Sequence, residues 1–350
     1  MKTSRLTCGL AVLVACLGAR ASTVSYSFQT VAFPGADFTN AQGISSTGEV
    51  VGFYTIGSTT TGFTLMNGKF KSIKFPGAAD TWVFGVNSKG ELVGQYQNVV
   101  APGIPGQAQG FTYLNGVFKT VNVPFSDAIL TNVSGVNSSG NEVVGNYGIV
   151  GGPAVGSGFS LNTVTDVFTS INVPGSPGTA VKGLADNGDI AGPMAASSLG
   201  GIGTGFLYDS GVFSPIVFPG STNDAAFGIT PSGNIIVGLY GSSPGGPFNG
   251  FVLTDGTYTT LNFPGAPGTM LFGVNDHGVI VGVTDNASGE IDKSFIATPT
   301  PESATLTLTF LGLSFVLAAR LLRGRMVAML LNFVAMPNAH PHEQACPTRR

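Results

Sequence analysis

Few residues of this 350-residue sequence have the types and the spacing that chemistry requires, and the best candidates recur within a repeated phrase. The phrase is a short run that ends in glycine, an Asn-x-x-Gly turn and a second run, as in Gly85–Tyr96. Four residues before its first glycine, the six copies place five hydroxyls and one carboxylate: Thr39, Thr81, Thr131, Thr179, Asp224 and Thr269. A polar ring of this kind at a channel mouth would bind water, a cation or sugar hydroxyls. In the alternative interpretation, each side chain caps its own Phe-Pro-Gly turn.

Aromatic residues at a second repeated position offer surfaces for stacking. The second run of the phrase ends in tyrosine in four copies, at Tyr54, Tyr96, Tyr147 and Tyr240, and Trp82 is the only tryptophan. Tyrosine has an apolar face and a polar tip, which suits a sugar ring. Alternatively, an aromatic residue that occurs once per repeat packs between neighbouring repeats. These side chains are therefore candidate binding residues, together with the hydroxyl ring.

Catalytic and metal-binding constellations are scarce. His277 is the only histidine between Ser22 and Thr298, and this region has no cysteine. A catalytic triad or a two-histidine metal site needs partners that this region lacks. Its carboxylates are spread along the repeats and form no local pair like that of a glycosidase. We therefore predict no catalytic residue, no metal and no cofactor, and favour a non-enzymatic role.

The repeated phrase belongs to a larger unit of four short strands. After the two strands of the phrase come a Gly-Phe-x-Leu strand and a strand that ends in Phe-Pro or Val-Pro, with prolines at 34, 76, 124, 174, 219 and 264. Four strands in about 45 residues is the size of one propeller blade. The chain starts with a strand of the fourth kind, at Ser25–Phe33, and finishes with one of the third kind, at Ser294–Thr298. The sequence therefore predicts an all-β protein: a six-bladed β-propeller of four-stranded antiparallel blades, spanning residues 22–298, whose N-terminal strand completes the last blade and closes the ring.

Charge is sparse in the repeats. Residues 22–298 contain 7 Lys, no Arg and 16 Asp or Glu, a formal charge of −9. An acidic region without a guanidinium group is poorly suited to a phosphate backbone, which argues against nucleic-acid binding. We expect a monomer.

The N-terminal end has the pattern of an export signal. Lys2 and Arg5 precede an apolar run and an Ala19-Arg20-Ala21 motif, which is typical of a signal peptide (residues 1–21) cleaved before Ser22. The run also contains Leu13–Cys16, which resembles a lipobox and would instead leave a lipidated cysteine. Both alternatives predict export.

The C-terminal end, residues 299–325, has a Pro301-Glu302 motif, an apolar stretch and three arginines, Arg320, Arg323 and Arg325. This order resembles the PEP-CTERM sorting signal of Gram-negative bacteria that produce exopolysaccharide. The resemblance implies processing by an exosortase-type machinery, a transient membrane anchor and a final location on the outer surface or in the extracellular matrix. The alternative is a plain membrane anchor. Residues 326–350 form an additional tail, which the family signal lacks and which we expect to be disordered.

The repeats themselves resemble the extracellular HAF-repeat family, although Gly-Phe replaces its His-Ala-Phe motif, so a role of that histidine does not transfer. Together, these features predict an exported, non-enzymatic propeller that acts as an extracellular or envelope binding or matrix-associated module, with exopolysaccharide or a surface protein as its partner. The alternative is a polysaccharide-active hydrolase or lyase on the same scaffold. A fold does not choose between them.

Overall fold

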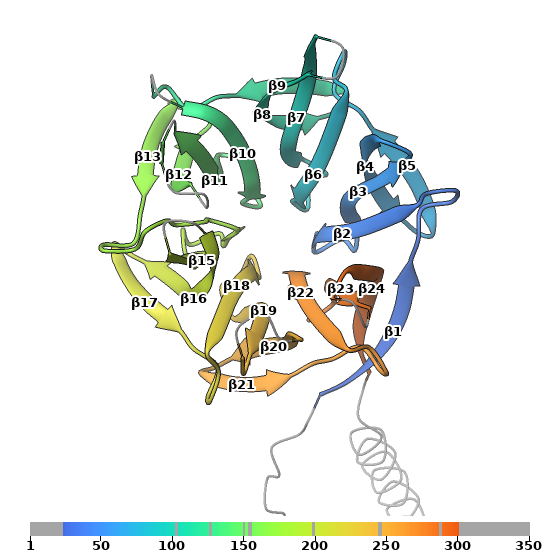
Figure 1. The fold of residues 1–350 in the computed structure, drawn as a ribbon, viewed down its shortest axis with the longest axis vertical. Helices are drawn as coiled ribbons and strands as arrows, with labels where there is room; N and C mark the ends of the chain where they lie inside the picture. Colours follow the sequence, from blue (N-terminus) through green and yellow to red (C-terminus); the bar gives the residue numbers. More distant parts are fainter. Residues whose placement is uncertain are drawn as a thin grey trace, which may run out of the picture. The chain divides into compact units, whose positions relative to one another are not determined.

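The computed structural model describes residues 24–300, apart from 102–103, 126–127, 150, 153–155, 198–199, 244–246 and 287–288. These residues form six four-stranded antiparallel sheets arranged around a centre, which confirms the predicted six-bladed β-propeller (Figure 1). None of the described residues forms a helix long and apolar enough to cross a membrane. The predicted signal peptide, the sorting motif from Pro301 onward and the tail lie outside the described residues.

Each blade contains four strands that follow one another from the centre to the rim. The innermost strands are β2 (Phe38–Ile44), β6 (Asp80–Val86), β10 (Ala128–Val136), β14 (Gly183–Leu184), β18 (Asn223–Ile229) and β22 (Gly268–Val274). The second strands are β3 (Val50–Ile56), β7 (Leu92–Ala101), β11 (Glu142–Ile149), β15 (Ile190–Ser197), β19 (Ile235–Gly241) and β23 (Ile280–Asp285). The third strands are β4 (Thr59–Met66), β8 (Ile104–Leu114), β12 (Ser157–Asn162), β16 (Gly200–Asp209), β20 (Asn249–Thr254) and β24 (Ile291–Thr300). The outermost strands are β5 (Lys69–Ile73), β9 (Val117–Val121), β13 (Val167–Ile171), β17 (Val212–Ile216), β21 (Thr257–Thr260) and β1 (Ser25–Val31).

One blade combines strands from both ends of the described chain. In its sheet, β1 lies next to β24, which is followed by β23 and β22 (Figure 1). The Ser27 hydroxyl donates a hydrogen bond of 3.4 Å to the Thr298 carbonyl. Because β24 continues to Thr300, strand structure extends two residues beyond the expected end of the propeller at residue 298.

Tight turns join the strands as the glycines and asparagines predict. The turn between β4 and β5 has positive φ at both central residues, 51° at Asn67 and 73° at Gly68. Asparagine and glycine adopt this conformation most readily, and it matches the twist of a two-residue hairpin. Between blades, Gly35 has a φ of 78° and the Ala36 amide donates to the Phe33 carbonyl. This is a Pro-Gly turn that redirects the chain into the next blade.

The core lies between neighbouring blades. The phenylalanine on the third strand of each blade is at most 1 % exposed, at Phe63, Phe111, Phe159, Phe206, Phe251 and Phe295. In one cluster Phe159 of the third blade packs with Val93 and Val121 of the second. Burying such a side chain contributes about 1.5–3 kcal/mol, so the stability of each blade depends on its neighbours.

The first glycine of the repeated phrase marks a close approach between inner strands. A Cβ at Gly43 would lie 2.8 Å from the Phe84 carbonyl oxygen, and one at Gly273 would lie 2.9 Å from that of Gln42. The six glycines thereby bring each inner strand against the next, including β22 against β2. A side chain at these positions would push two backbones apart. This close contact explains why glycine recurs there.

Candidate binding site in the central channel

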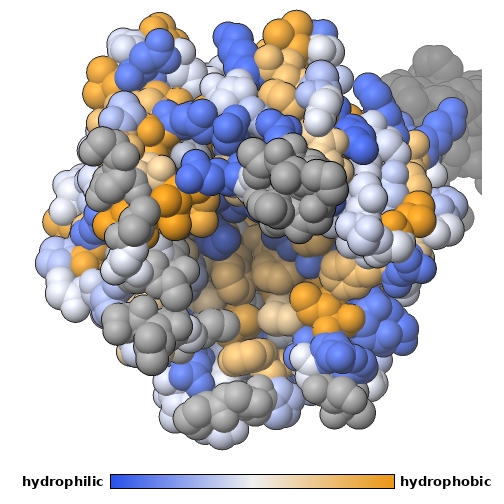
Figure 2. All heavy atoms as spheres, turned by 45° about the horizontal axis from the view of Figure 1, so that its top comes forward, coloured by the Kyte–Doolittle hydropathy of each residue, from blue (hydrophilic) through white to orange (hydrophobic). Residues whose placement is uncertain are grey.

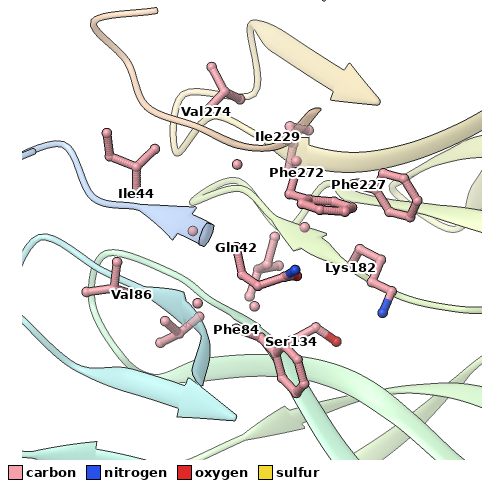
Figure 3. Close-up of a pocket in the computed structure, with 18 of the residues that line it drawn as sticks. Gln42, Ile44, Phe84, Val86, Ser134, Lys182, Phe227, Ile229, Phe272 and Val274 are labelled. Atoms are coloured by element: carbon pink, nitrogen blue, oxygen red, sulfur yellow. The ribbon is translucent and has the colours of Figure 1, made fainter. Parts of the chain in front are cut away.

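The six inner strands surround a cavity of about 140 Å³ at the centre of the propeller (Figure 3). Its wall has two tiers, which flank the repeated glycine. The tier before the glycine consists of Gln42, Phe84, Ser134, Lys182, Phe227 and Phe272. The tier after it consists of Ile44, Val86, Val136, Leu184, Ile229 and Val274. Figure 2 shows the propeller hollowed at its centre, with mostly hydrophobic residues inside the hollow and both hydrophilic and hydrophobic residues around it.

A β-bulge aims the first tier into the channel. In the blade of β2 and β3, Ala41 pairs with Gly52 and Gly43 with Val51, so Gln42 has no partner across the ladder. The same register shift leaves Phe84, Ser134, Phe227 and Phe272 unpaired. A bulge inserts one residue and redirects its side chain. Five of the six first-tier residues therefore owe their position to a bulge.

The first tier combines aromatic faces with polar groups. The rings of Phe227 and Phe272 meet edge to face, with centroids 5.2 Å apart. The Gln42 amide nitrogen donates to Asn40 Oδ1 at 2.6 Å. The Ser134 hydroxyl donates to the Val181 carbonyl at 2.8 Å, which ties β10 to the segment that carries Lys182. The second tier is entirely aliphatic, so one end of the cavity is apolar and the other is mixed.

Lys182 is the only ionisable residue among the described residues that line this cavity. Its side chain is partly exposed, so water reaches it, although protein surrounds it on the channel wall. Desolvation by the surrounding protein lowers the pKa of its ammonium group. Figure 3 shows the side chain between Phe227 and Ser134, which belong to the two adjacent blades.

The predicted hydroxyl ring is not part of this wall, and its expected place at the channel mouth is corrected by the structure. Thr81, Thr131, Thr179, Asp224 and Thr269 are at most 3 % exposed, and Thr39 is partly buried. Each accepts a hydrogen bond from the backbone amide of the residue before the interblade proline, for example Thr81 from Phe75 at 3.1 Å and Asp224 from Phe218 at 2.9 Å. The structure therefore supports the alternative interpretation, in which these side chains cap their own turns.

Asp224 caps its turn more fully than the threonines do. Both of its carboxylate oxygens accept hydrogen bonds from the Ser221 hydroxyl, at 2.8 and 2.7 Å. Its exceptional residue type is thus explained by a local turn, and the carboxylate lies away from the channel wall.

The candidate tyrosines also pack internally. Tyr54, Tyr96 and Tyr240 stack on Phe33, Phe75 and Phe218 with centroids 3.6–3.7 Å apart. Tyr147 makes a tilted contact with Phe125 at 4.9 Å. Phe33, Phe75 and Phe218 directly precede the interblade proline, whereas Phe125 directly follows it. The tyrosines hold the turn against the blade that follows it, and in three of them the stacked phenylalanine covers one face of the ring.

Trp82 lies on β6, two residues before Phe84 of the first tier, and is partly exposed. It is not among the residues that line the cavity.

The first tier does not stand out in the sequence because its members differ from blade to blade. A comparison of repeats draws attention to positions that recur, such as the glycine and the threonine. The residue directly before the glycine is Gln, Phe, Ser, Lys, Phe and Phe in turn. The available signal was this variation beside a fixed glycine, together with the single lysine.

His277 lies in the turn between β22 and β23, where its backbone amide donates to Asn275 Oδ1 at 3.1 Å. Within the described part of the chain, no three His, Cys, Asp or Glu side chains gather as metal ligands would.

No family model and no curated protein matches this chain. Among solved structures, it is similar to a protein of unknown function from Dyadobacter fermentans, with a TM-score of 0.51, 10% identity and coverage of 79% of this chain and 99% of that chain. It is also similar to a putative TolB from Agrobacterium tumefaciens, with a TM-score of 0.47, 13% identity and coverage of 75% and 91%. A third match is the PQQ-bound aldose sugar dehydrogenase from Streptomyces coelicolor, with a TM-score of 0.46, 12% identity and coverage of 79% and 99%. At these identities the likeness concerns the propeller fold alone.

Proposed function

We propose that this chain is an exported, non-enzymatic binding module of the extracellular or envelope space, and that exopolysaccharide is its ligand. The observation that supports this proposal most is the wall of the central cavity. Three phenylalanine rings, an amide, a hydroxyl and an ammonium group converge there from six different blades. A rigid scaffold that presents a few polar groups among apolar ones is typical of a small-molecule site.

The cavity has the size of one unsubstituted six-membered ring. An apolar protein cavity of about 150 Å³ binds benzene, so about 140 Å³ would take the ring of a sugar, and its substituents would extend along the channel. The aromatic faces would contact the C–H groups of a sugar, and the amide and ammonium groups would bind its hydroxyls. The channel would therefore bind one residue of a polysaccharide, such as a chain end.

The proposed location of the protein rests on the sequence patterns at the two ends of the chain. The signal-peptide pattern would direct export, with cleavage after Ala21, and the Pro301-Glu302 motif with its following arginines would engage an exosortase-type machinery. The mature propeller would then reside on the outer surface or in the matrix of a Gram-negative bacterium, after a transient membrane anchor.

The proposal is tested with the full purified chain and a panel of bacterial and plant polysaccharides. Protein retention and the release of reducing or unsaturated ends are recorded in the same tubes. We expect retention without release, and weaker retention for Trp82→Ala and Gln42→Ala than for the exposed-surface control Lys71→Ala. Release that is lost on mutating a carboxylate would overturn the proposal in favour of a hydrolase or lyase. The absence of both signals would also overturn it and leave a structural or protein-binding role.

A further inference from the structure

Lys182 differs from every other lysine of the propeller. The six others, Lys69, Lys71, Lys74, Lys89, Lys119 and Lys293, are exposed at the outside. Two of them have partners: Lys89 donates to the Ser139 carbonyl at 2.8 Å, and Lys293 lies 3.4 Å from Asp292. Within the described residues, the Lys182 ammonium group has neither a hydrogen bond nor a salt bridge. The protein thus keeps an unpaired cation on the wall of its central cavity.

An unpaired cation in such a position needs an explanation. Enclosure by protein disfavours the charged form of a lysine, and the lowered pKa of Lys182 reflects this desolvation. Methionine or leucine would fill the same space without this penalty. Lysine at this position is therefore unfavourable for the ligand-free fold, and such a residue is a candidate for function.

The neighbours of Lys182 leave its charge available. Ser134 on β10 has its hydroxyl engaged with the Val181 carbonyl, and Phe227 on β18 is apolar. Gln42 on β2, Phe84 on β6 and Phe272 on β22 complete the tier, and none of them is charged. Asp224, the nearest carboxylate along β18, is bound to Ser221 and to the Phe218 amide. An anion that entered the cavity would therefore meet one cation and no repelling carboxylate.

We propose that the cavity is a binding site for a cyclic monocarboxylate the size of one six-membered ring, with Lys182 as the partner of the carboxylate. The ring would contact Phe227 and Phe272, whose edge-to-face pair lies on the two blades that follow Lys182. The aliphatic second tier would limit how deeply the ring enters the channel. This inference rests on the proposed function, because it assigns an acidic sugar residue as the part of the polysaccharide that the channel binds.

The acidic character of the propeller makes this site selective. Residues 22–298 carry a formal charge of −9, which repels anions in general. A single lysine can balance a single carboxylate, whereas a ligand with several negative charges gains no second partner in the cavity. Within the cavity, a ring with one carboxylate is therefore preferred over a ring with several negative charges.

The test is isothermal titration of the full chain with four ligands at neutral pH: glucuronate, glucose, benzoate and benzyl alcohol. We expect glucuronate or benzoate to bind, and each to bind more tightly than its neutral counterpart. Lys182→Met should weaken carboxylate binding about 10- to 100-fold, the range of a hydrogen bond to a charged group. Lys71→Met, which removes an exposed charge, should leave the affinity unchanged. Glucuronate binding without benzoate binding would support an acidic sugar residue as the ligand. Benzoate binding without glucuronate binding would overturn that assignment in favour of an apolar ring acid.

A second measurement does not depend on the folding of a variant. Acetylation of lysines in the wild-type chain is followed by mass spectrometry with and without ligand. The ligand should protect Lys182 and leave Lys71 and Lys119 unchanged. Equal protection of all lysines, equal affinity of wild type and Lys182→Met, or no carboxylate binding would each overturn the inference.

The outcomes also separate this inference from the proposed function. Small carboxylates that bind at Lys182 without any retention on polysaccharide would uphold the site and refute the polysaccharide role. If Lys182→Met is retained on polysaccharide as well as the wild type, the polysaccharide role is upheld and the site at Lys182 is refuted.

Discussion

At the scale of the residue, Lys182 links stability to binding. In the folded protein, desolvation lowers the pKa of its ammonium group below that of an unfolded lysine, about 10.4. Desolvation of the charged ammonium group therefore reduces the free energy of unfolding. This reduction is fully present below the folded pKa and disappears as the pH rises from the folded pKa to the unfolded pKa. We predict that Lys182→Met increases the free energy of unfolding at neutral pH by about 1 kcal/mol, the low end of the cost of an unpaired polar group, because the side chain is only partly buried. Urea unfolding at neutral and alkaline pH measures this, and the gain should shrink at the higher pH.

The matched control is Lys71→Met, which removes an exposed lysine and should change the free energy of unfolding by less than about 0.5 kcal/mol. A Lys182→Met variant that is less stable than the wild type at neutral pH would show that the ammonium group stabilises the ligand-free channel.

At the scale of the element, the inner strands depend on glycine at their closest approach. A Cβ at Gly228 on β18 would lie 2.6 Å from the Phe272 carbonyl oxygen and 3.1 Å from the Gly273 Cα on β22. Both atoms belong to backbone and yield only if a blade shifts. We predict that Gly228→Ala lowers the free energy of unfolding by about 1–3 kcal/mol, as overpacking does. Gly241→Ala is the control, because its Cβ would meet the Phe248 side chain at 3.3 Å and no backbone atom closer than 3.6 Å. Equal effects of the two substitutions in chemical denaturation would contradict this account of the repeated glycine.

The same strands show what the sequence can and cannot predict. The six blades were predictable because Gly-Phe, Asn-Gly and Phe-Pro impose burial, turns and strand ends locally. The channel wall was not, because a bulge at Gln42, Phe84, Ser134, Phe227 and Phe272 breaks the alternation on which strand predictions depend. Thr81 illustrates the consequence: it pairs with Tyr96 across β6 and β7, on the side that packs against the interblade turn. The capping position serves the scaffold in every blade, whereas the first-tier position, whose residue type differs between blades, faces the cavity.

At the scale of the whole molecule, the blade that contains β1 connects the two ends of the propeller. The Phe28 ring on β1 lies 5.3 Å from that of Phe263 and 5.5 Å from that of Phe295. Since every blade shares its core with its neighbours, a loss of packing contacts in this blade should also destabilise the other blades. We predict that Phe28→Ala lowers the free energy of unfolding of the whole ring by about 2 kcal/mol while unfolding remains a single transition. Thr30→Ala, at an exposed position of the same strand, is the control.

Hydrogen exchange distinguishes a closed ring from a row of blades. If β1 closes the ring, Phe28→Ala should accelerate the slowest exchange in β12 and β15, on distant blades, as well as in β23. In an open array each blade contacts only its neighbours, and opening at one end leaves distant repeats protected. Faster exchange confined to β22, β23 and β24 would therefore show that β1 serves only its own blade. If the whole ring loosens, the six inner strands also separate more easily from one another. The cavity around Lys182 then loses its fixed geometry. Carboxylate binding should then weaken in Phe28→Ala, although the substitution lies in an outermost strand.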